Sequence, residues 1–257
     1  MQTTYDYHTH TTYSHGKGSI MDNAVTAKEK GLLGIAITDH GFSHPAFGMK
    51  RRKLEQMRAD CTEAEKATGV KILLGVESNI CGQSGRIDVR PSDYEKLDMI
   101  GAGIHRFVFY ETPFDYMRLV GDTIVYSVFK KKPSESLIDY TTRCYVNAIK
   151  KNPIDLITHL NYLVFCDCKT VAQCCADYGT YLEINTKKVH MSDEQWEEVL
   201  KTDVRFIIDS DAHTPDRVGD MKLFEELYKR VKIPLDRIVN LGSEPPRMRF
   251  AEFKKRL

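Results

Sequence analysis

Short apolar runs alternate with amphipathic stretches along almost the whole chain. This alternation is typical of strands and helices that take turns in a parallel sheet, because strands covered on both faces are nearly continuous in Val, Ile and Leu. Seven such runs predict strands at residues 5–10, 34–39, 71–77, 98–105, 154–159, 180–184 and 204–209. Seven strands with helical patterns between them indicate an α/β fold of the β/α barrel type.

Five amphipathic stretches between these runs predict helices, at residues 20–30, 49–68, 133–150, 193–201 and 216–231. Ser19 and Ser192 stand where a helix N-cap is expected, since a hydroxyl there can accept a hydrogen bond from the first turn. Gly69 follows the second helix, as a C-terminal glycine should, and Pro133 falls in the first turn of the third. Helix boundaries are therefore marked at several points by the residue types themselves.

The length of 257 residues fits one large domain of ordinary barrel size. The segment 110–132 is rich in aromatic residues and lacks a strand pattern, and we expect it to be a helical insertion folded over one end of the barrel. Residues 245–257, where Phe250 and Phe253 alternate with basic residues, are expected to form a short amphipathic tail that packs on the barrel. The whole chain is thus predicted to be a single domain.

Charge and cysteine content narrow the partners and the compartment. With 37 basic and 36 acidic residues the net charge is +1, which provides no broad field for nucleic acid or an anionic membrane. No run of about 18 apolar residues occurs, so we expect a soluble, cytoplasmic protein without nucleic-acid or membrane partners. The oligomeric state is left open.

Seven cysteines form an odd set, as expected for reduced thiols. Four of them lie close together in the sequence, namely Cys166, Cys168, Cys174 and Cys175. Their spacing lacks the paired pattern of structural zinc sites, so ordinary thiols are favoured.

Residues of metal-binding type stand at the ends of most predicted strands. They are His8, His10 and His15 at the first strand, His40 at the second, Glu77 at the third, His105 at the fourth, His159 at the fifth, and Asp211 and His213 after the seventh. Parallel strands of a barrel end at one rim, so these residues are expected to converge although some two hundred positions separate them. The two-residue spacing of His8 and His10 places both imidazoles on one face of the strand, toward the interior.

Such a cluster requires a cation, because several carboxylates buried together would repel one another. Imidazole with carboxylate suits Zn²⁺, Mn²⁺ or Fe²⁺ better than Mg²⁺ or Ca²⁺, which prefer oxygen ligands. Nine candidate ligands exceed what two ions with open positions need. We therefore expect three divalent transition-metal ions.

Together these motifs resemble the PHP superfamily, named for polymerase and histidinol phosphatase. The resemblance lies in the sequences HTHTTYSHG at residues 8–16, TDHG at 38–41, GVE at 75–77 and SDAH at 210–213, with His105 and His159 in the expected order between them. It covers residues 5 to about 213. One departure is His15, where many members carry Asp.

The resemblance implies a distorted seven-stranded barrel with a trinuclear site. His8, His10, Glu77 and Asp211 would hold one ion, bridging Glu77 with His105 and His159 a second, and His15, His40 and His213 a third. Glu77, His105 and Asp211 would be catalytic as ligands that activate a water for attack on phosphorus.

For the substrate, the family implies a small phosphomonoester, with histidinol phosphate as its best-known example. Arg106 and Lys17 are the cations we expect to bind the phosphate. His44 and His190 match no motif and are interpreted as surface or capping residues, although His44 is close enough to the second strand to line the cavity. Asp39 and Asp209 could orient an imidazole or cap a loop, and the sequence favours neither role.

Three other functions stay open. A nuclease or other phosphodiesterase is disfavoured by the near-neutral charge. An amidohydrolase-like enzyme that cleaves C–N bonds would typically carry Lys where Glu77 stands. A non-catalytic metal-binding module would be expected to lack some ligands, whereas all nine positions are filled.

Overall fold

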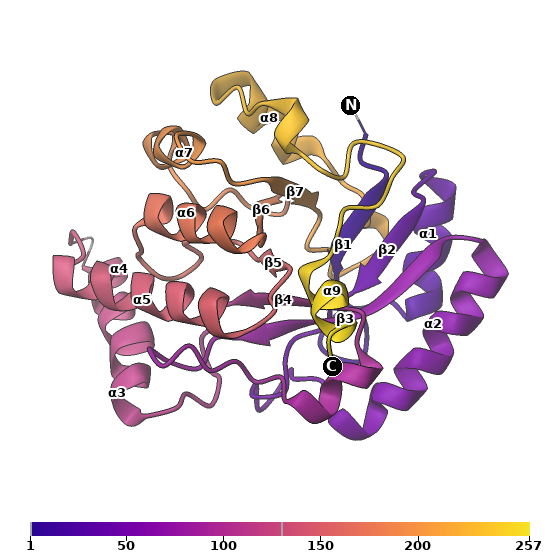
Figure 1. Cartoon of the computed structure of the whole chain (residues 1–257), viewed down its shortest axis with the longest axis horizontal. Coiled ribbons are helices and arrows are strands. Elements are labelled where there is room, and N and C mark those ends of the chain that lie inside the picture. Colours follow the sequence, from indigo (N-terminus) through magenta and orange to yellow (C-terminus); the bar gives the residue numbers. More distant parts are fainter. Residues whose placement is uncertain (1, 130) are drawn as a thin grey trace.

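The computed structural model describes residues 2–129 and 131–257, and its centre is a sheet of seven parallel strands (Figure 1). The strands are β1 (Tyr5–Thr9), β2 (Gly34–Ile37), β3 (Lys71–Asn79), β4 (Met99–Gly103), β5 (Leu156–Ile157), β6 (Tyr181–Asn185) and β7 (Phe206–Asp209). Each pairs with the next in chain order. All seven predicted strands are confirmed, although β5 is limited to two residues.

The sheet curves into a nearly closed barrel. Thr9, at the end of β1, forms a parallel bridge with Ala212, which follows β7. The N–H of His10 donates to the Ala212 carbonyl at 2.8 Å. The N–H of Tyr7 donates to the Asp209 carboxylate at 2.6 Å, which ties the same two strands together. The predicted single-domain distorted (β/α)7 barrel is therefore confirmed.

Two irregularities distort this barrel. The first half of β3 pairs with β2 and its second half with β4, so the two neighbours of β3 are staggered along it. The register of β1 against β2 shifts between Asp6 and Thr9. Such a bulge re-aims side chains, which explains why the consecutive residues Tyr7 and His8 are both buried in the interior, Tyr7 in an apolar layer and His8 among other imidazoles.

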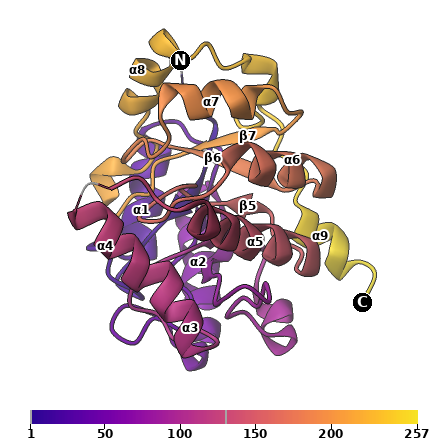
Figure 2. The same ribbon diagram turned by 90° about the vertical axis from the view of Figure 1, so that its left-hand side faces the viewer.

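The helices cover the outside of the barrel (Figures 1 and 2). They are α1 (Ile20–Glu29), α2 (Leu54–Thr68), α5 (Glu135–Lys151), α6 (Cys168–Tyr178), α7 (Asp193–Leu200) and α8 (Lys222–Arg230), with short 3₁₀ turns η1 (Arg51–Lys53), η2 (Pro91–Lys96), η4 (Pro215–Arg217) and η5 (Leu235–Arg237). Ser19 and Ser192 each form a capping box, and Gly69 ends α2 with φ +77°, as predicted.

Two helix predictions need correction, and one helix was missed. Pro133 precedes α5 instead of lying in its first turn, because Ser134 provides the N-cap and accepts from the Leu137 N–H. The helix predicted at 216–231 begins only at Lys222, since the turn η4 and Gly219 with φ +70° come first. Helix α6 was not predicted.

Residues 110–132 contain α3 (Pro113–Tyr116), the π-helix η3 (Met117–Asp122) and α4 (Thr123–Val128), which lie on one side of the barrel (Figure 2). Lys130 lies outside the described residues. The tail forms α9 (Arg249–Lys254), where Phe250 is fully buried and lies 5.2 Å from the ring of Tyr94. Within the described residues, every helix is too short or too polar to cross a membrane.

Apolar side chains fill the amino-terminal part of the barrel interior. They are Tyr5, Tyr7, Ala36, Met99, Leu156, Tyr181, Ile207 and Met248. A larger apolar layer packs between the sheet and the helices. Only the carboxyl ends of the strands are therefore left for polar chemistry.

Candidate metal centre

All nine histidines of the chain gather at the carboxyl ends of the strands. Each imidazole centroid lies between 4.2 and 6.2 Å from that of another histidine. The convergence expected from the strand ends is thus present, and it extends to His44 and His190, which the sequence did not assign to the site.

Glu77, at the end of β3, lies at the centre of the cluster and is fully buried. Its Oε1 atom lies 2.6 Å from His159 Nε2, 3.0 Å from His105 Nε2 and 3.4 Å from His8 Nε2. Its Oε2 atom lies 2.8 Å from His40 Nδ1 and 3.6 Å from His10 Nε2. One carboxylate therefore faces five imidazoles.

Asp211, after β7, provides a second acidic centre. Its Oδ1 atom lies 3.5 Å from His10 Nε2 and 3.2 Å from His213 Nδ1. The side chain is 9% exposed, so it faces the opening of the site while Glu77 lies beneath it.

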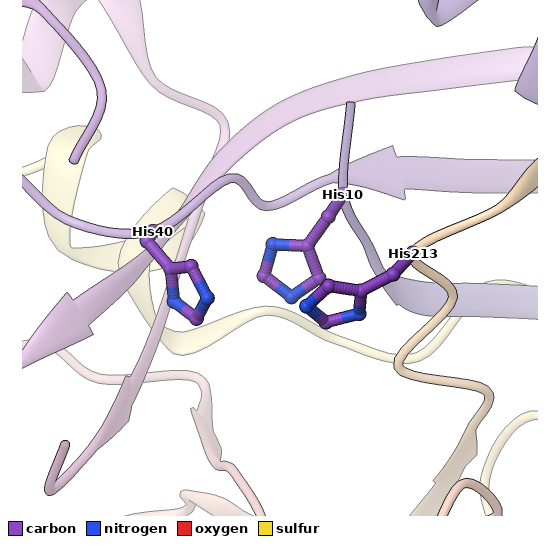
Figure 3. A group of neighbouring side chains, drawn as sticks. All are labelled: His10, His40 and His213. Atoms are coloured by element: carbon purple, nitrogen blue, oxygen red, sulfur yellow. The ribbon is translucent and has the colours of Figure 1, made fainter. Parts of the chain in front are cut away.

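Four overlapping groups bring three potential ligand atoms within 4.8 Å of one another. They are His8, His10 and Asp211; His8, Glu77 and His159; His40, Glu77 and His105; and His10, His40 and His213 (Figure 3). Among the described residues His15 joins none of these groups, although its ring stacks at 4.7 Å on His40 and lies 4.3 Å from His213.

Several of these atoms lack hydrogen-bond partners. Glu77 Oε2 and His40 Nδ1 are buried and lie 2.8 Å apart, yet neither makes a hydrogen bond in the described structure. The Nδ1 atoms of His10 and His159 are likewise buried without partners. Buried polar atoms without partners are costly. Lone-pair atoms that face one another in this way are suited to binding a cation. The mixed nitrogen and oxygen set suits Zn²⁺, Mn²⁺ or Fe²⁺.

The protonation of the outer histidines also suits metal binding. Burial lowers the pKa of His40 to about 4. Burial, aided by repulsion from His213, lowers the pKa of His15 to about 4 as well. Both imidazoles are therefore neutral near pH 7 and offer a lone pair.

Two orienting residues escaped the sequence analysis. Glu183, buried on β6, accepts a hydrogen bond from His8 Nδ1 at 2.5 Å, and its other oxygen accepts from the His159 backbone N–H. Asn79 Oδ1 lies 2.8 Å from His105 Nδ1. A ring nitrogen held in this way directs the other nitrogen into the site. The sequence feature that could have identified Glu183 is its position as a single acid within the apolar run that predicts the sixth strand.

Asp39 and Asp209 accept hydrogen bonds from loop and backbone groups, and neither is hydrogen-bonded to an imidazole among the described residues. Asp39 accepts from the N–H and hydroxyl of Thr11 at 2.7 and 2.6 Å and from the Ser14 hydroxyl, which fixes the loop after β1. Burial raises the pKa of Asp39 to about 6. Asp209 accepts from Tyr7 and helps to close the barrel. Of the two roles left open by the sequence, the structure favours the loop and backbone role.

Backbone strain is concentrated at the same rim. The described non-glycine residues with positive φ are Phe107, His159, Asn161, Leu163 and Asp211, with φ values from +26° to +69°. Residues with side chains rarely adopt this conformation, and strain of this kind is typical of functional sites. The loops after β4, β5 and β7 therefore hold unfavourable conformations where the ligand residues converge.

A cavity of about 490 Å³ opens above the cluster. Its lining includes His44, His190, Arg106, Lys187 and Lys188, and its walls also contain Phe47, Phe107, Tyr162 and Leu163. Arg106 is half-buried, with a buried Nε atom that has no partner among the described residues. Lys17 is exposed and is not among the lining residues, so its role in substrate binding stays a prediction.

Lys187 is a cation that contacts the ligand residues directly. Its Nζ atom lies 3.2 Å from Asp211 Oδ1 and 3.0 Å from His213 Nδ1. Lys187 and Lys188 follow β6, for which no site residue was predicted. They escaped prediction because nothing in the local sequence distinguishes them from other surface lysines.

A parallel barrel that gathers histidines and acids at its carboxyl rim has the arrangement of a metal-dependent enzyme. The PHP domain model matches residues 6–187, and the chain belongs to this family. A protein named Probable phosphatase from Caldanaerobacter subterraneus subsp. tengcongensis is 29% identical, over 98% of this chain and 92% of its own. One of the same name from Thermoanaerobacter sp. is 30% identical, over 90% and 86% of the two chains. The chain is a metal-dependent phosphatase.

Among solved structures, the fold is similar to histidinol phosphate phosphatase from Lactococcus lactis subsp. lactis, complexed with zinc, L-histidinol and phosphate. The TM-score is 0.58 at 15% identity, over 90% of this chain and 93% of the other. At this identity the likeness establishes the fold alone.

Proposed function

We propose that this phosphatase hydrolyses a small phosphomonoester by a histidinol-phosphatase-like mechanism, at a site that holds three divalent transition-metal ions. The observation that carries the proposal is the buried Glu77 carboxylate, which lies within 3.6 Å of five imidazole nitrogens from four other segments of the chain. A buried carboxylate is costly among neutral imidazoles alone, whereas bound cations would compensate its charge.

The ligand residues fall into three sets. His8, His10, Glu77 and Asp211 would hold one ion, Glu77 with His105 and His159 a second, and His15, His40 and His213 a third. The close approach of His10 to His40 and His213 makes His10 an alternative to His15 in the third set. Bound ions of this type supply an activated water and neutralise phosphoryl oxygens.

The protein's own residues position the reactants. Glu183 and Asn79 hold His8 and His105 in fixed orientations. Arg106, which lines the cavity and has an unpartnered Nε, is the residue we assign to the phosphoryl oxygens, since a guanidinium can donate two parallel hydrogen bonds. Lys187, beside Asp211, adds a second positive charge to the cavity.

The size and charge of the cavity favour a small monoester. About 490 Å³ suits a compact phosphorylated metabolite. The net charge of +1 provides little attraction for a nucleic-acid backbone, so we expect no nucleic-acid partner.

Elemental analysis combined with turnover of a phosphomonoester panel tests this function. We expect close to three transition-metal equivalents in the purified protein, and Glu77→Gln and His105→Ala should lose both metal and at least about 100-fold in turnover, because each removes a ligand. Lys229→Met, at an exposed position on α8, is the matched control. Turnover that survives complete removal of metal would refute the mechanism.

A further inference from the structure

The charges that line the cavity are unequal. Arg106, Lys187 and Lys188 contribute three cations, whereas Asp211 is the only carboxylate among the described lining residues. Asp211 already contacts His10, His213 and Lys187. The cavity therefore has no carboxylate available to receive a positively charged group of a substrate.

The acids nearest to the cavity are engaged as well. Glu77 is fully buried beneath it and faces five imidazoles. Both oxygens of Glu183 accept hydrogen bonds, from His8 on one side and from the His159 N–H and Asn185 on the other. An ammonium or imidazolium group on a substrate would meet lysines and no free acid.

The three cations are also separated around the rim. Arg106 follows β4 and the two lysines follow β6, so the loop after β5 with Tyr162 lies between them. Lys187 contacts the metal-ligand residues, while the exposed Lys188 has no ion pair or side-chain hydrogen bond among the described residues. The proposed function assigns Arg106 and Lys187 to the phosphoryl group, which leaves the charge of Lys188 unmatched.

From this arrangement we propose that the cavity selects a phosphomonoester that carries a second anionic group, and that Lys188 binds this second anion. The inference rests on the proposed phosphatase function for the position of the first phosphate. It predicts that phosphate esters of cationic amino alcohols bind poorly, because their positive group would meet lysines and no free carboxylate.

Non-hydrolysable phosphonates of equal length separate this inference from catalysis. Binding of propylphosphonate, 3-phosphonopropionate, propane-1,3-diphosphonate and 3-aminopropylphosphonate to the metal-loaded protein can be measured by titration calorimetry. We expect one of the two second anions, carboxylate or phosphonate, to bind at least about 10-fold more tightly than propylphosphonate, since a charge-assisted hydrogen bond contributes this much. The better of the two identifies the type of anion. The aminopropyl compound should bind most weakly.

Lys188 variants then assign the selectivity. Lys188→Met should reduce the preference for the second anion about 10-fold and Lys188→Arg should restore it, whereas Lys229→Met, which makes the same charge change on α8, should keep it. Three results would overturn the inference: equal affinity for propylphosphonate and for both probes with a second anion, tighter binding of 3-aminopropylphosphonate than of propylphosphonate, or a preference that survives Lys188→Met. Selective binding without turnover of any phosphomonoester would instead count against the proposed function alone.

Discussion

At the scale of single residues, the contact between Glu183 and His8 determines how the deepest ligand is held. The carboxylate binds His8 Nδ1, so Nε2 of the same ring points toward Glu77 at 3.4 Å. Glu183 also receives the N–H of His159, a residue held at φ +26°. One buried acid therefore positions a ligand ring and stabilises a strained ligand backbone.

Glu183→Gln should weaken metal binding by about 10- to 100-fold, because it removes the charge that fixes the His8 ring while keeping the side-chain shape. Metal affinity measured by competition with a chromogenic chelator checks this. Glu197→Gln, an exposed acid on α7, is the control. An affinity equal to that of the wild type would mean that the contact does not orient His8.

The candidate ligands were predictable from sequence and their partners were not. His8, His40 and Glu77 stand at strand ends, which the apolar pattern locates. Which acid contacts which ring depends on the curvature of the barrel, because Glu183 on β6 reaches His8 on β1 across β7. The roles of these ligands toward metal stay predictions.

At the scale of elements, local signals succeeded where one residue type decides the geometry. Ser19, Ser192 and Gly69 cap their helices as expected. Helix α6 was not predicted, although its pattern is helical. Cys168, Val171, Ala172 and Cys175 are buried at helical spacing, so with Cys counted as apolar the period becomes visible.

Helix α9 is held to the barrel mainly by Phe250. Its ring is fully buried, so Phe250→Ala should lower the free energy of unfolding by about 3–5 kcal/mol, as expected for a large cavity. Phe253→Ala, a partly exposed ring on the same helix, should cost clearly less. Urea denaturation of both variants checks the order, and equal losses would argue against this packing.

Asp155 links the same helix to the sheet and should make stability depend on pH. Its carboxylate accepts from the N–H groups of Ile100 and Phe250, both at 2.8 Å. Burial raises its pKa to about 7, although these two hydrogen bonds oppose the shift. The folded protein thus holds this proton more tightly than the unfolded chain, and stability falls as pH rises from about 4 to about 7.

Between pH 5.5 and 7.5 this group should cost about 2 kcal/mol of folding free energy. Asp155→Asn should abolish that part of the pH dependence. The variant should start less stable, because its amide NH2 group replaces one of the two accepting oxygens and would face an N–H donor. Denaturation of both proteins across this range gives the difference. Parallel pH profiles would show that Asp155 is ionised throughout.

At the scale of the whole molecule, the parallel topology explains how a chain with a net charge of only +1 brings nine candidate metal ligands together at one site. Order β1 to β7 brings the ends of distant segments to one rim, and the bridge from Thr9 to Ala212 places both halves of the cluster together. The sequence predicted this because strand period and direction follow from local pattern. It could not predict the bulge in β1 or the strained rim loops, which depend on closure of the barrel.

This concentration of ligands should link metal binding to global stability. Ions bound only by the folded state stabilise it by about 2.7 kcal/mol at a free concentration 100 times the dissociation constant. For a chain of this size we expect the midpoint of thermal unfolding to fall by at least about 5 °C on chelation and to recover with Zn²⁺ or Mn²⁺ more than with Mg²⁺. Glu77→Gln should respond much less, because the carboxylate shared by the histidines is gone. Differential scanning calorimetry at matched protein concentration checks this. An unfolding midpoint that is the same with and without chelator would contradict a metal centre at this rim.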